Sequence, residues 1–505
     1  MGKECTLGTV SLPALIRCRG ALAALAIVGC NGASPSPIDR GTVELRPSDR
    51  AIGETASADG PRGERPALDG VPPAPDGPPT SCGAIVSFET GKQPSKILHV
   101  ATSGSDGAGD GSAGKPFATI VKAAAGAQPG TAIRIHAGSY PGGTYLSGLA
   151  GNASAPIWLG GAPGEARPLI SGGGEGLHLS KVRYLVVHDL EVTGVSSNGI
   201  NADDGGERTN PDATRFLVFR GLAIHGIGAG GNQDCLKLSG VNDFQVLDSS
   251  FSQCGGGQAG SGIDHVGCHD GLIARCSFKD LSGNAVQAKG GSENLEIRWN
   301  LIVDGGERAL NLGGSTGFDF FRPPLSGSAT NAEARKLRAV ANVIVGGTAA
   351  LAYVGCVDCL VANNTIVTPH NWILRILQET VTGGGYAFAP ASNGTFVNNL
   401  VVFDRSDLST TLNVGPNTQP SSFVFKHNLW FARDDPSQST PSLPVAESAA
   451  VIGLDPKLAN PAAGNYTIPL ASPAAKKGTP VPGVTGDRAG RCYASPPSIG
   501  AHEAS

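Results

Sequence analysis

The stretch LEIRWNLIV (295–303) decides the fold, because it is two short apolar strands joined at an amide and the chain repeats it. Later copies are RAVANVIVG (338–346), CLVANNTIV (359–367), TFVNNLVVF (395–403) and FVFKHNLWF (423–431). Four earlier copies, YLVVHDLEV, FLVFRGLAI, FQVLDSSFS and GLIARCSFK, lie between residues 184 and 279, and most steps are 22 to 35 residues. Such a period is typical of a solenoid, in which each unit buries its apolar face only against its neighbours.

The residue at the joint changes character along the chain. It is Asp189, Gly221, Ser249 and Cys276 in the first four copies, and Asn300, Asn342, Asn364, Asn399 and Asn428 in the last five. Equivalent residues of stacked β-coils lie roughly 4.8 Å apart. We therefore expect the five asparagines to form an internal ladder of side-chain amides, with a structural role.

A second series of short strands, bounded by glycine, lies between these copies. Its members include NGINAD (198–203), DCLKLSG (234–240), SGIDHVGC (261–268), NAVQAKGG (284–291) and WILRILQE (372–379). Neither the leucine spacing of a horseshoe nor stretches of helical periodicity accompany the repeats. The sequence therefore predicts an all-β fold, a single-stranded right-handed parallel β-helix.

Composition agrees with many short strands and sets limits on partners. The 505 residues include 73 Gly and 36 Pro, the hydrophobic share is 40%, and charged residues make up only 16%. Such a chain can bury a core but must turn often. The net charge of -4, without a local run of Lys or Arg, argues against nucleic acid as a partner.

The N-terminus has the order of an export signal. Lys3, Arg17 and Arg19 precede an apolar run that is too short to span a bilayer and ends at Cys30. We interpret 1–29 as a lipoprotein signal peptide and Cys30 as the lipidated residue, with an ordinary cleaved signal as the alternative. Residues 30–80, rich in Pro and Gly, predict a disordered tether. The protein would then be exported and lipid-anchored at the outer membrane or cell surface, touching the membrane only through its lipid.

Eight cysteines follow Cys30, an even number that permits disulfides in an oxidising compartment. Cys356 and Cys359 are close enough in sequence to pair locally, but the remaining pairing cannot be deduced from sequence. A zinc site is the alternative for this CxxC, although no second pair accompanies it.

Both ends of the folded part resemble a known family. The segment LHVATSGSDGAGDGSAGKPFATIVKAAAGAQPGTAIRIHAGSY (98–140), and the closing strings LDPKLAN (454–460) and SIGAHE (498–503), resemble the pectate-lyase-like right-handed parallel β-helix superfamily of extracellular proteins. The resemblance implies that PFATIVKAAAGA (116–127) is an N-terminal capping helix, in which Phe117, Ile120, Val121 and Ala124 share one apolar face. The domain would occupy 81–505, with a capping segment at 96–140, coils at 141–432 and a closing segment at 433–505.

Chemistry in such a fold would lie on an outward-facing row of side chains, because alternate residues of a strand point to opposite faces. In the glycine-bounded strands this outer row comprises Asn201, Lys237, Asp264, Gln287, Asn311, Ala352, Arg375 and Asn413. The plain alternative is a solvated sheet face. Charges concentrate near Asp234, Lys237, Asp264, Lys289 and Arg308, and a long loop, 315–335, interrupts the repeat at that point.

Uronate-containing polysaccharides can be cut by β-elimination, which requires a base at the carbon beside a neutralised carboxylate. Lys289 is the first candidate base and Lys237 the second. The segment NAVQAKGGSENLEIRWN (284–300) resembles the β-helix alginate and chondroitin lyases, in which a Lys before Ser is the base and an Arg assists, a role we give to Arg308. The residues predicted to bind substrate are Asp264, Gln287, Asn311, Arg322, Trp372 and Arg375.

A calcium ion could neutralise the substrate carboxylate instead. The positions of that family's calcium-binding carboxylates hold Ala285 and Gln287 here. Asp203, Asp234 and Asp264 form the alternative candidate Ca²⁺ site, and no other cofactor is predicted.

These residues favour a cell-surface protein acting on an acidic polysaccharide, with a lyase as the first hypothesis. A non-catalytic carbohydrate-binding or adhesive lipoprotein is the second. A glycoside hydrolase or an epimerase is the third, since Asp234 and Asp264 lie one coil apart and could serve as paired carboxylates. We expect a monomer in each case.

Overall fold

The computed structural model describes residues 82–505. The predicted signal peptide 1–29, the lipidation of Cys30 and the tether 30–80 lie outside the described residues. Among residues 82–505, no helix is long and apolar enough to cross a membrane.

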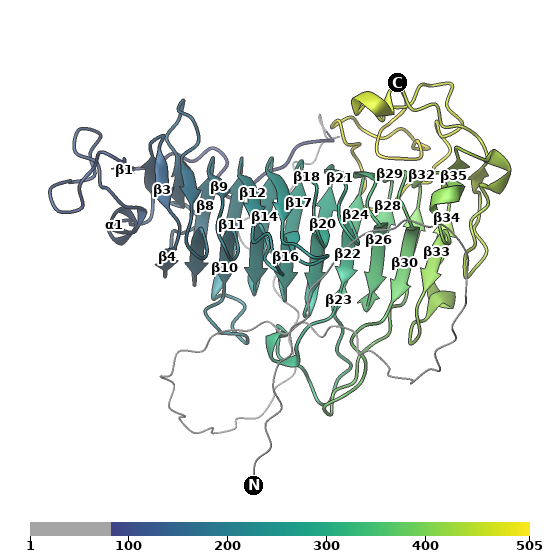
Figure 1. The fold of residues 1–505 in the computed structure, drawn as a ribbon, viewed down its shortest axis with the longest axis horizontal. Helices are drawn as coiled ribbons and strands as arrows, with labels where there is room; N and C mark the ends of the chain where they lie inside the picture. Colours follow the sequence, from purple (N-terminus) through teal and green to yellow (C-terminus); the bar gives the residue numbers. More distant parts are fainter. Residues whose placement is uncertain (1–81) are drawn as a thin grey trace, which may run out of the picture. The chain divides into compact units, whose positions relative to one another are not determined.

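Three parallel sheets run along the solenoid, because each coil contributes one short strand to each of them (Figure 1). The fourteen-stranded sheet contains β1 (Lys96–Val100), β2 (Thr131–Ile135), β5 (Ile157–Gly161), β8 (Arg183–His188), β11 (Thr214–Arg220), β14 (Val241–Leu247), β17 (His269–Ala274), β20 (Ser292–Arg298), β23 (Ala334–Arg335), β24 (Arg338–Val340), β27 (Cys356–Val357), β28 (Leu360–Ala362), β31 (Thr395–Val397) and β34 (Val424–Lys426).

The other two sheets complete each coil. The ten-stranded sheet contains β4 (Thr144–Ser147), β7 (Leu177–Ser180), β10 (Ile200–Asp203), β13 (Leu236–Ser239), β16 (Ser261–Val266), β19 (Asn284–Lys289), β22 (Leu310–Gly313), β26 (Ala349–Val354), β30 (Trp372–Leu377) and β33 (Leu412–Val414). The twelve-stranded sheet contains β3 (Ser139–Pro141), β6 (Leu169–Ser171), β9 (Glu191–Thr193), β12 (Ala223–Ile227), β15 (Ser250–Cys254), β18 (Ser277–Lys279), β21 (Leu301–Val303), β25 (Val343–Val345), β29 (Thr365–Val367), β32 (Leu400–Phe403), β35 (Leu429–Ala432) and β36 (Val451–Ile452). The predicted right-handed parallel β-helix is confirmed.

The joint in each repeat is a two-residue corner between the fourteen-stranded and twelve-stranded sheets. Its first residue has positive φ, as at Trp299 with φ 61°, and its second residue points inward. In the first two copies the predicted alignment is wrong by one residue. Asp189 and Gly221 occupy the first position of the corner, because they have φ of 51° and 62°. Register therefore assigns the inward position there to the residues that follow them.

The asparagine ladder at this corner is confirmed. The Asn342 side chain accepts from Asn300 Nδ2 at 2.9 Å and donates to Asn364 Oδ1 at 3.0 Å, and each further step repeats this pattern. Glu447 ends the ladder, because its carboxylate accepts from the backbone and side chain of Asn428 at 2.9 and 2.7 Å. Every amide is thereby satisfied inside an apolar core.

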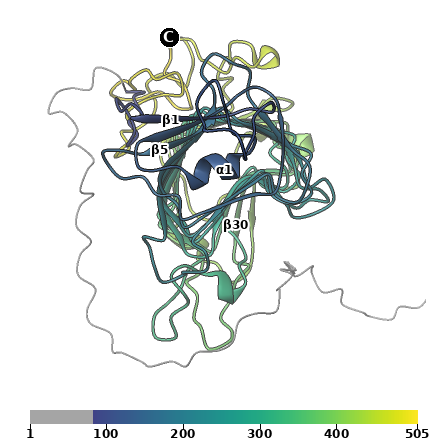
Figure 2. The same cartoon turned by 90° about the vertical axis from the view of Figure 1, so that its left-hand side faces the viewer.

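The N-terminal cap is α1 (Ile120–Ala125), which lies across the end of the coil stack (Figure 2). The Thr119 hydroxyl caps it by accepting from the Lys122 backbone amide at 3.2 Å. Ile120 and Ala123 face the core, whereas Val121 is 50% exposed. The predicted apolar face is thus right at Ile120 and wrong at Val121. Coils also begin earlier than residue 141, since β2 and β3 already pair with later coils.

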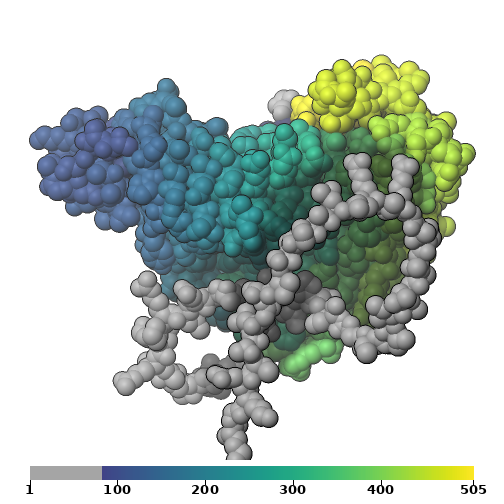
Figure 3. All heavy atoms as spheres, viewed as in Figure 1, coloured from purple at the N-terminus to yellow at the C-terminus, as the bar shows by residue number. Residues whose placement is uncertain are grey.

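Five short 3-10 helices lie in the connections. They are η1 (Phe318–Phe320), η2 (Arg405–Asp407), η3 (Pro420–Ser422), η4 (Pro436–Gln438) and η5 (Pro461–Ala463). The closing segment 433–505 does more than end the stack, because Ile468 and Ile499 pack on the outer face of the twelve-stranded sheet at Leu400 and Leu429. Figure 3 shows it in yellow beside the last coils.

Residues 82–92 form a strap on the outer face of the fourteen-stranded sheet. Ile85 and Phe88 pack against Val186 and Val218 there. A disulfide joins Cys82 to Cys492 of the closing segment. Two further disulfides, Cys235–Cys254 and the locally closed Cys356–Cys359, fix single coils, while Cys268 and Cys276 are buried free thiols.

We expect Cys82→Ser to lower the free energy of unfolding by about 3 kcal/mol, because this disulfide closes a very long loop. Denaturant unfolding with and without reductant measures the loss. Cys276→Ser is the matched control for removing a buried sulfur that makes no disulfide. Equal stability of Cys82→Ser and the unmodified protein would show that the strap is held by packing alone.

Candidate functional site

The outer row exists as predicted on the ten-stranded sheet. Pairing places Asn201 beside Lys237, Lys237 beside Asp264, Asp264 beside Gln287, and Gln287 beside Asn311. The row ends with Ala352, Arg375 and Asn413. The sheet also continues it in the other direction, to His178 and Tyr145.

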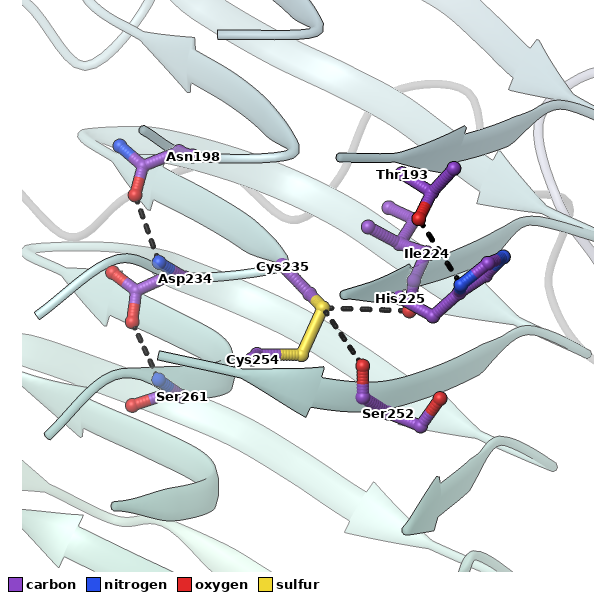
Figure 4. The surroundings of a disulfide bond; sticks show 9 residues. All are labelled: Thr193, Asn198, Ile224, His225, Asp234, Cys235, Ser252, Cys254 and Ser261. Carbon is purple, nitrogen blue, oxygen red and sulfur yellow. Dashed lines mark hydrogen bonds between the residues drawn. A yellow bond between two sulfur atoms is a disulfide. The ribbon is translucent and has the colours of Figure 1, made fainter. Parts of the chain in front are cut away.

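Lys237 lies between two carboxylates at the charged centre of this row. Its Nζ contacts Asp264 Oδ2 and lies 3.3 Å from Asp234 Oδ2. Asp234 precedes Cys235 of the Cys235–Cys254 disulfide and accepts from the Ser261 backbone amide at 2.7 Å (Figure 4). Both aspartate side chains are 3% exposed and that of Lys237 is 23% exposed. The cluster is therefore held by buried ion pairs on a covalently fixed strand.

Burial and neighbouring charges shift the pKa values of the two carboxyl groups in opposite directions. Burial raises the pKa of Asp234 to about 6. Burial also disfavours the charge of Asp264, but the ammonium groups of Lys237 and Lys289 hold the pKa of Asp264 below its ordinary value. Although Lys237 is desolvated, Asp264 and Asp234 raise the pKa of Lys237. The two carboxylates thus stabilise the Lys237 ammonium group, which favours Lys289 over Lys237 as the base.

Lys289 ends β19, one coil beyond Asp264. Its Nζ lies 3.9 Å from Asp264 Oδ2, and its side chain is 11% exposed. A side chain at Gly314 would come within 3.3 Å of Lys289 Cβ and within 2.8 Å of Gln287 Nε2. A register shift after Gln287 places Gly313 beside Ala288 rather than beside Lys289. Gly313, which ends β22, and Gly314 after it therefore let the chain pass close to the lysine.

Glu333 anchors the turn after Lys289, and the sequence reasoning missed it. This buried carboxylate accepts from the Gly290 amide at 2.9 Å, from the Thr316 amide and hydroxyl at 2.9 and 2.8 Å, and from the Thr380 hydroxyl. It thereby joins the β19–β20 turn to the loops 314–333 and 378–392. Burial raises the pKa of Glu333. No repeat marks it, because it lies in the insertion.

The loops that follow β10, β22 and β30 project from the same side of the coils (Figures 1 and 2). Phe318 stacks on Phe388 with ring centroids 5.6 Å apart, and its edge contact with Tyr386 has the same centroid distance. Arg208 lies over the Phe320 ring at 5.6 Å. These contacts join the loop 315–335 to the loops that follow β10 and β30.

Arg322 does not join the outer row. Its guanidinium makes a bidentate ion pair with Asp204, at 2.6 and 3.0 Å, and the residue is 8% exposed. To reach Asp204 it crosses Gly240 and Gly267, where a side chain would meet it within 2.7 Å. The predicted substrate-binding role is corrected to that of a loop anchor.

The three aspartates predicted to bind Ca²⁺ are not brought together. The Asp203 carboxylate is engaged by His178 Nε2 at 2.7 Å and by the Ser180 hydroxyl at 2.8 Å. Lys237 already neutralises Asp234 and Asp264. Within residues 82–505, no group of three His, Cys, Asp or Glu residues could hold a metal ion. The residues present therefore do not fit the predicted site.

At the far end of the row, Arg375 lies 4.1 Å over the Trp372 ring and donates to Asn413 Oδ1 at 3.1 Å. One face of the Trp372 ring, which is predicted to bind substrate, is thus occupied by Arg375. Arg308 forms an ion pair with Glu379 at 2.5 Å, and it precedes β22, at the end of that strand away from Lys289. The predicted catalytic Arg308 therefore belongs to a separate group with Trp372 and Arg375.

Two buried acceptors of the row have no hydrogen-bond partner among the described residues: Asp264 Oδ1 and Asn311 Oδ1. Both residues are 2% exposed. Unsatisfied buried acceptors cost free energy unless a donor reaches them. Hydroxyl groups are donors of the required kind.

Comparison with a solved pectate lyase agrees with the fold. No family model matches the chain, and a search of curated proteins found no match. Pectate lyase Pel9A has a TM-score of 0.53 at 17% identity, over 82% of this chain and 98% of that chain. An alginate lyase from Paenibacillus sp. scores 0.41 at 15% identity, over 64% and 97%. An endo-xylogalacturonan hydrolase from Aspergillus tubingensis scores 0.39 at 12% identity, over 70% and 100%.

Proposed function

We propose, from the parallel β-helix fold that this chain shares with pectate lyase, that it cleaves an acidic polysaccharide by β-elimination. The reacting sugar would lie on the outer row between Lys237 and Asn311. The carrying observation is the group of Lys289, Lys237 and Asp264, which places a basic side chain beside a fixed cation and an unpaired acceptor.

Each residue has a distinct role in this proposal. Lys289 removes the proton from the carbon beside the uronate carboxylate. The electron pair forms the new double bond, and the glycosidic oxygen leaves and takes up a proton. Lys237, which stays charged, faces the negative charge that develops on the carboxylate. Asp264 Oδ1 and Asn311 Oδ1 accept hydrogen bonds from sugar hydroxyls, which orients the ring.

Glycoside hydrolysis is the second candidate, and the two aspartates favour it. Asp234 has a pKa of about 6 because it is buried, while the pKa of Asp264 is held low by the neighbouring ammonium groups despite burial. A carboxyl pair with separated pKa values can divide the roles of general acid and base. Hydrolysis would release reducing ends without a new double bond.

We also propose that the protein works outside the cytoplasm, anchored through the Cys30 lipid. Three disulfides within residues 82–505 support an oxidising compartment. A polysaccharide at the cell surface would be accessible there.

The test is incubation of the protein with polygalacturonate, alginate and chondroitin, with Ca²⁺ or a chelator. Ultraviolet absorbance follows new unsaturated ends, and a reducing-sugar assay follows all cleavage. We expect unsaturated ends without a need for Ca²⁺. Reducing ends alone would establish the hydrolase, and binding without cleavage of any polymer would establish a carbohydrate-binding protein.

Lys289→Ala is expected to lower kcat at least about 100-fold, since a general base contributes about 10²–10⁴. Circular dichroism checks the fold. Lys279→Ala is the matched control, because the Lys279 side chain is 67% exposed on the twelve-stranded sheet. Full activity of Lys289→Ala would refute its role as the base.

A further inference from the structure

We propose that Tyr145 and His178 form a distal subsite for an uncharged sugar, so that the substrate is a polysaccharide in which uronates are interspersed with neutral residues. This inference rests on the proposed function for the location of the reacting sugar.

Tyr145 offers an open aromatic surface on the same face as the charged centre. The ring is 55% exposed, although β4 belongs to the sheet and its neighbour Leu146 is buried. The Tyr145 and His178 rings make an edge-to-face contact, with centroids 4.9 Å apart and planes at 81°. The contact holds the phenol ring from one side. An amphipathic ring held in this way can stack on the apolar face of a pyranose.

The groups around His178 suit hydroxyls and disfavour carboxylates. His178 donates to Glu175 at 2.8 Å and to Asp203 at 2.7 Å. Partial burial disfavours its charge, but these two carboxylates raise the pKa of His178 to about 10. Two carboxylates against one imidazolium leave an excess negative charge at neutral pH. A uronate here would meet like charge, whereas a neutral sugar can donate hydroxyl hydrogens to carboxylate oxygens.

The charged centre differs in this respect. There, two basic side chains, Lys237 and Lys289, lie beside the carboxylates of Asp234 and Asp264. The same row therefore carries one basic side chain for each carboxylate at one position, and a single imidazole for two carboxylates at another. This contrast argues against a homopolymer of uronates lying along the whole row.

Spacing fixes how a chain reaches both positions. Four register steps separate Tyr145 from Asp264, passing His178, Asn201 and Lys237. At roughly 4.8 Å a step the separation is about 19 Å. Only an oligosaccharide of several sugars spans this distance. The subsite would thus strengthen binding of long chains and leave the shortest substrates unaffected.

The test measures binding of the full-length protein to four probes by affinity electrophoresis and calorimetry. Polygalacturonate and alginate contain only uronates, whereas unsulfated chondroitin and hyaluronan alternate a uronate with a neutral amino sugar. We expect tighter binding of an alternating polymer than of either polyuronate. Tyr145→Ala should raise its Kd roughly tenfold through the lost stacking, and Tyr145→Phe should keep most of the affinity.

A length series of the alternating probe supplies the decisive readout. We expect the loss of affinity caused by Tyr145→Ala to grow with the length of the oligosaccharide, and to reach about tenfold only for chains long enough to span both positions. The matched control is Val424→Ala, which truncates a side chain 47% exposed on the fourteen-stranded sheet. Tighter binding of polyuronates, or an unchanged Kd for Tyr145→Ala, would overturn the subsite.

Failure of the subsite is distinguishable from failure of the proposed reaction. Unsaturated ends from a polyuronate, with no effect of Tyr145→Ala, would keep the lyase and reject the subsite. Tyr145-dependent binding of an alternating polymer without cleavage would keep the subsite and reject the lyase. Absence of binding to all four probes would reject both.

Discussion

Lys237→Met is expected to lower the free energy of unfolding by about 4 kcal/mol at neutral pH. The substitution keeps the length of the side chain but removes the ammonium group that Asp234 and Asp264 share. Both carboxylates stay buried. Among the described residues, the nearest basic group left in an ion pair with either of them is Lys289, whose Nζ lies 3.9 Å from Asp264 Oδ2. The cost is the desolvation of charge that has lost its partner.

The loss should grow with pH. In the unmodified protein the pKa of Asp264 is held low, so its contribution is present above the unfolded value and is lost as the pH falls. Without Lys237, burial would raise the folded-state pKa of both carboxyls above the unfolded value. The variant would then be most stable when both are protonated and lose stability as the pH rises through those folded values.

Denaturant unfolding between pH 4 and pH 8 tests this expectation. The difference between Lys237→Met and the unmodified protein should be small at the acidic end and largest at the alkaline end. Lys279→Met is the control, and we expect little change because its side chain is 67% exposed. A loss independent of pH would show that packing, and not charge, accounts for the effect.

Periodicity explains why the sequence predicts the coils so well. The ladder from Asn300 to Asn428 and the outer row from Asn201 to Asn413 follow from equivalent positions of stacked strands. A one-residue error remained at Asp189 and Gly221. Both belong to the positive-φ corner, and only the backbone conformation distinguishes that position from the inward residue beside it.

Contacts from insertions could not be predicted in this way. Arg322 reaches Asp204, which is 118 residues earlier in the chain, through space left by two glycines. The row itself predicts that Lys237 is beside Asp264, but it does not show that Asp203 is already bound by His178. His178 and Tyr145 precede the first member of the glycine-bounded series in the sequence, so the predicted row begins only at Asn201.

The buried carboxylate of Glu333 gives the second large effect. Glu333→Ala is expected to cost about 4 kcal/mol, since four buried donors lose their acceptor at about 1 kcal/mol or more each. The loops 314–333 and 378–392 would separate from the turn after Lys289. Hydrogen exchange in both loops should rise, and kcat should fall more than KM changes, because Lys289 loses its fixed position.

Glu333→Gln separates position from charge. The amide keeps one acceptor oxygen, so we expect a smaller loss of stability and partial recovery of kcat. Burial raises the pKa of Glu333, so its contribution to stability is full below the unfolded value and declines as the pH rises through the folded value. The Gln variant should lack this decline. Glu293→Ala, which removes a partly exposed partner of Lys336, controls for the loss of one acidic residue. Unchanged exchange in both loops for Glu333→Ala would mean that the aromatic contacts of Phe318 hold them without the carboxylate.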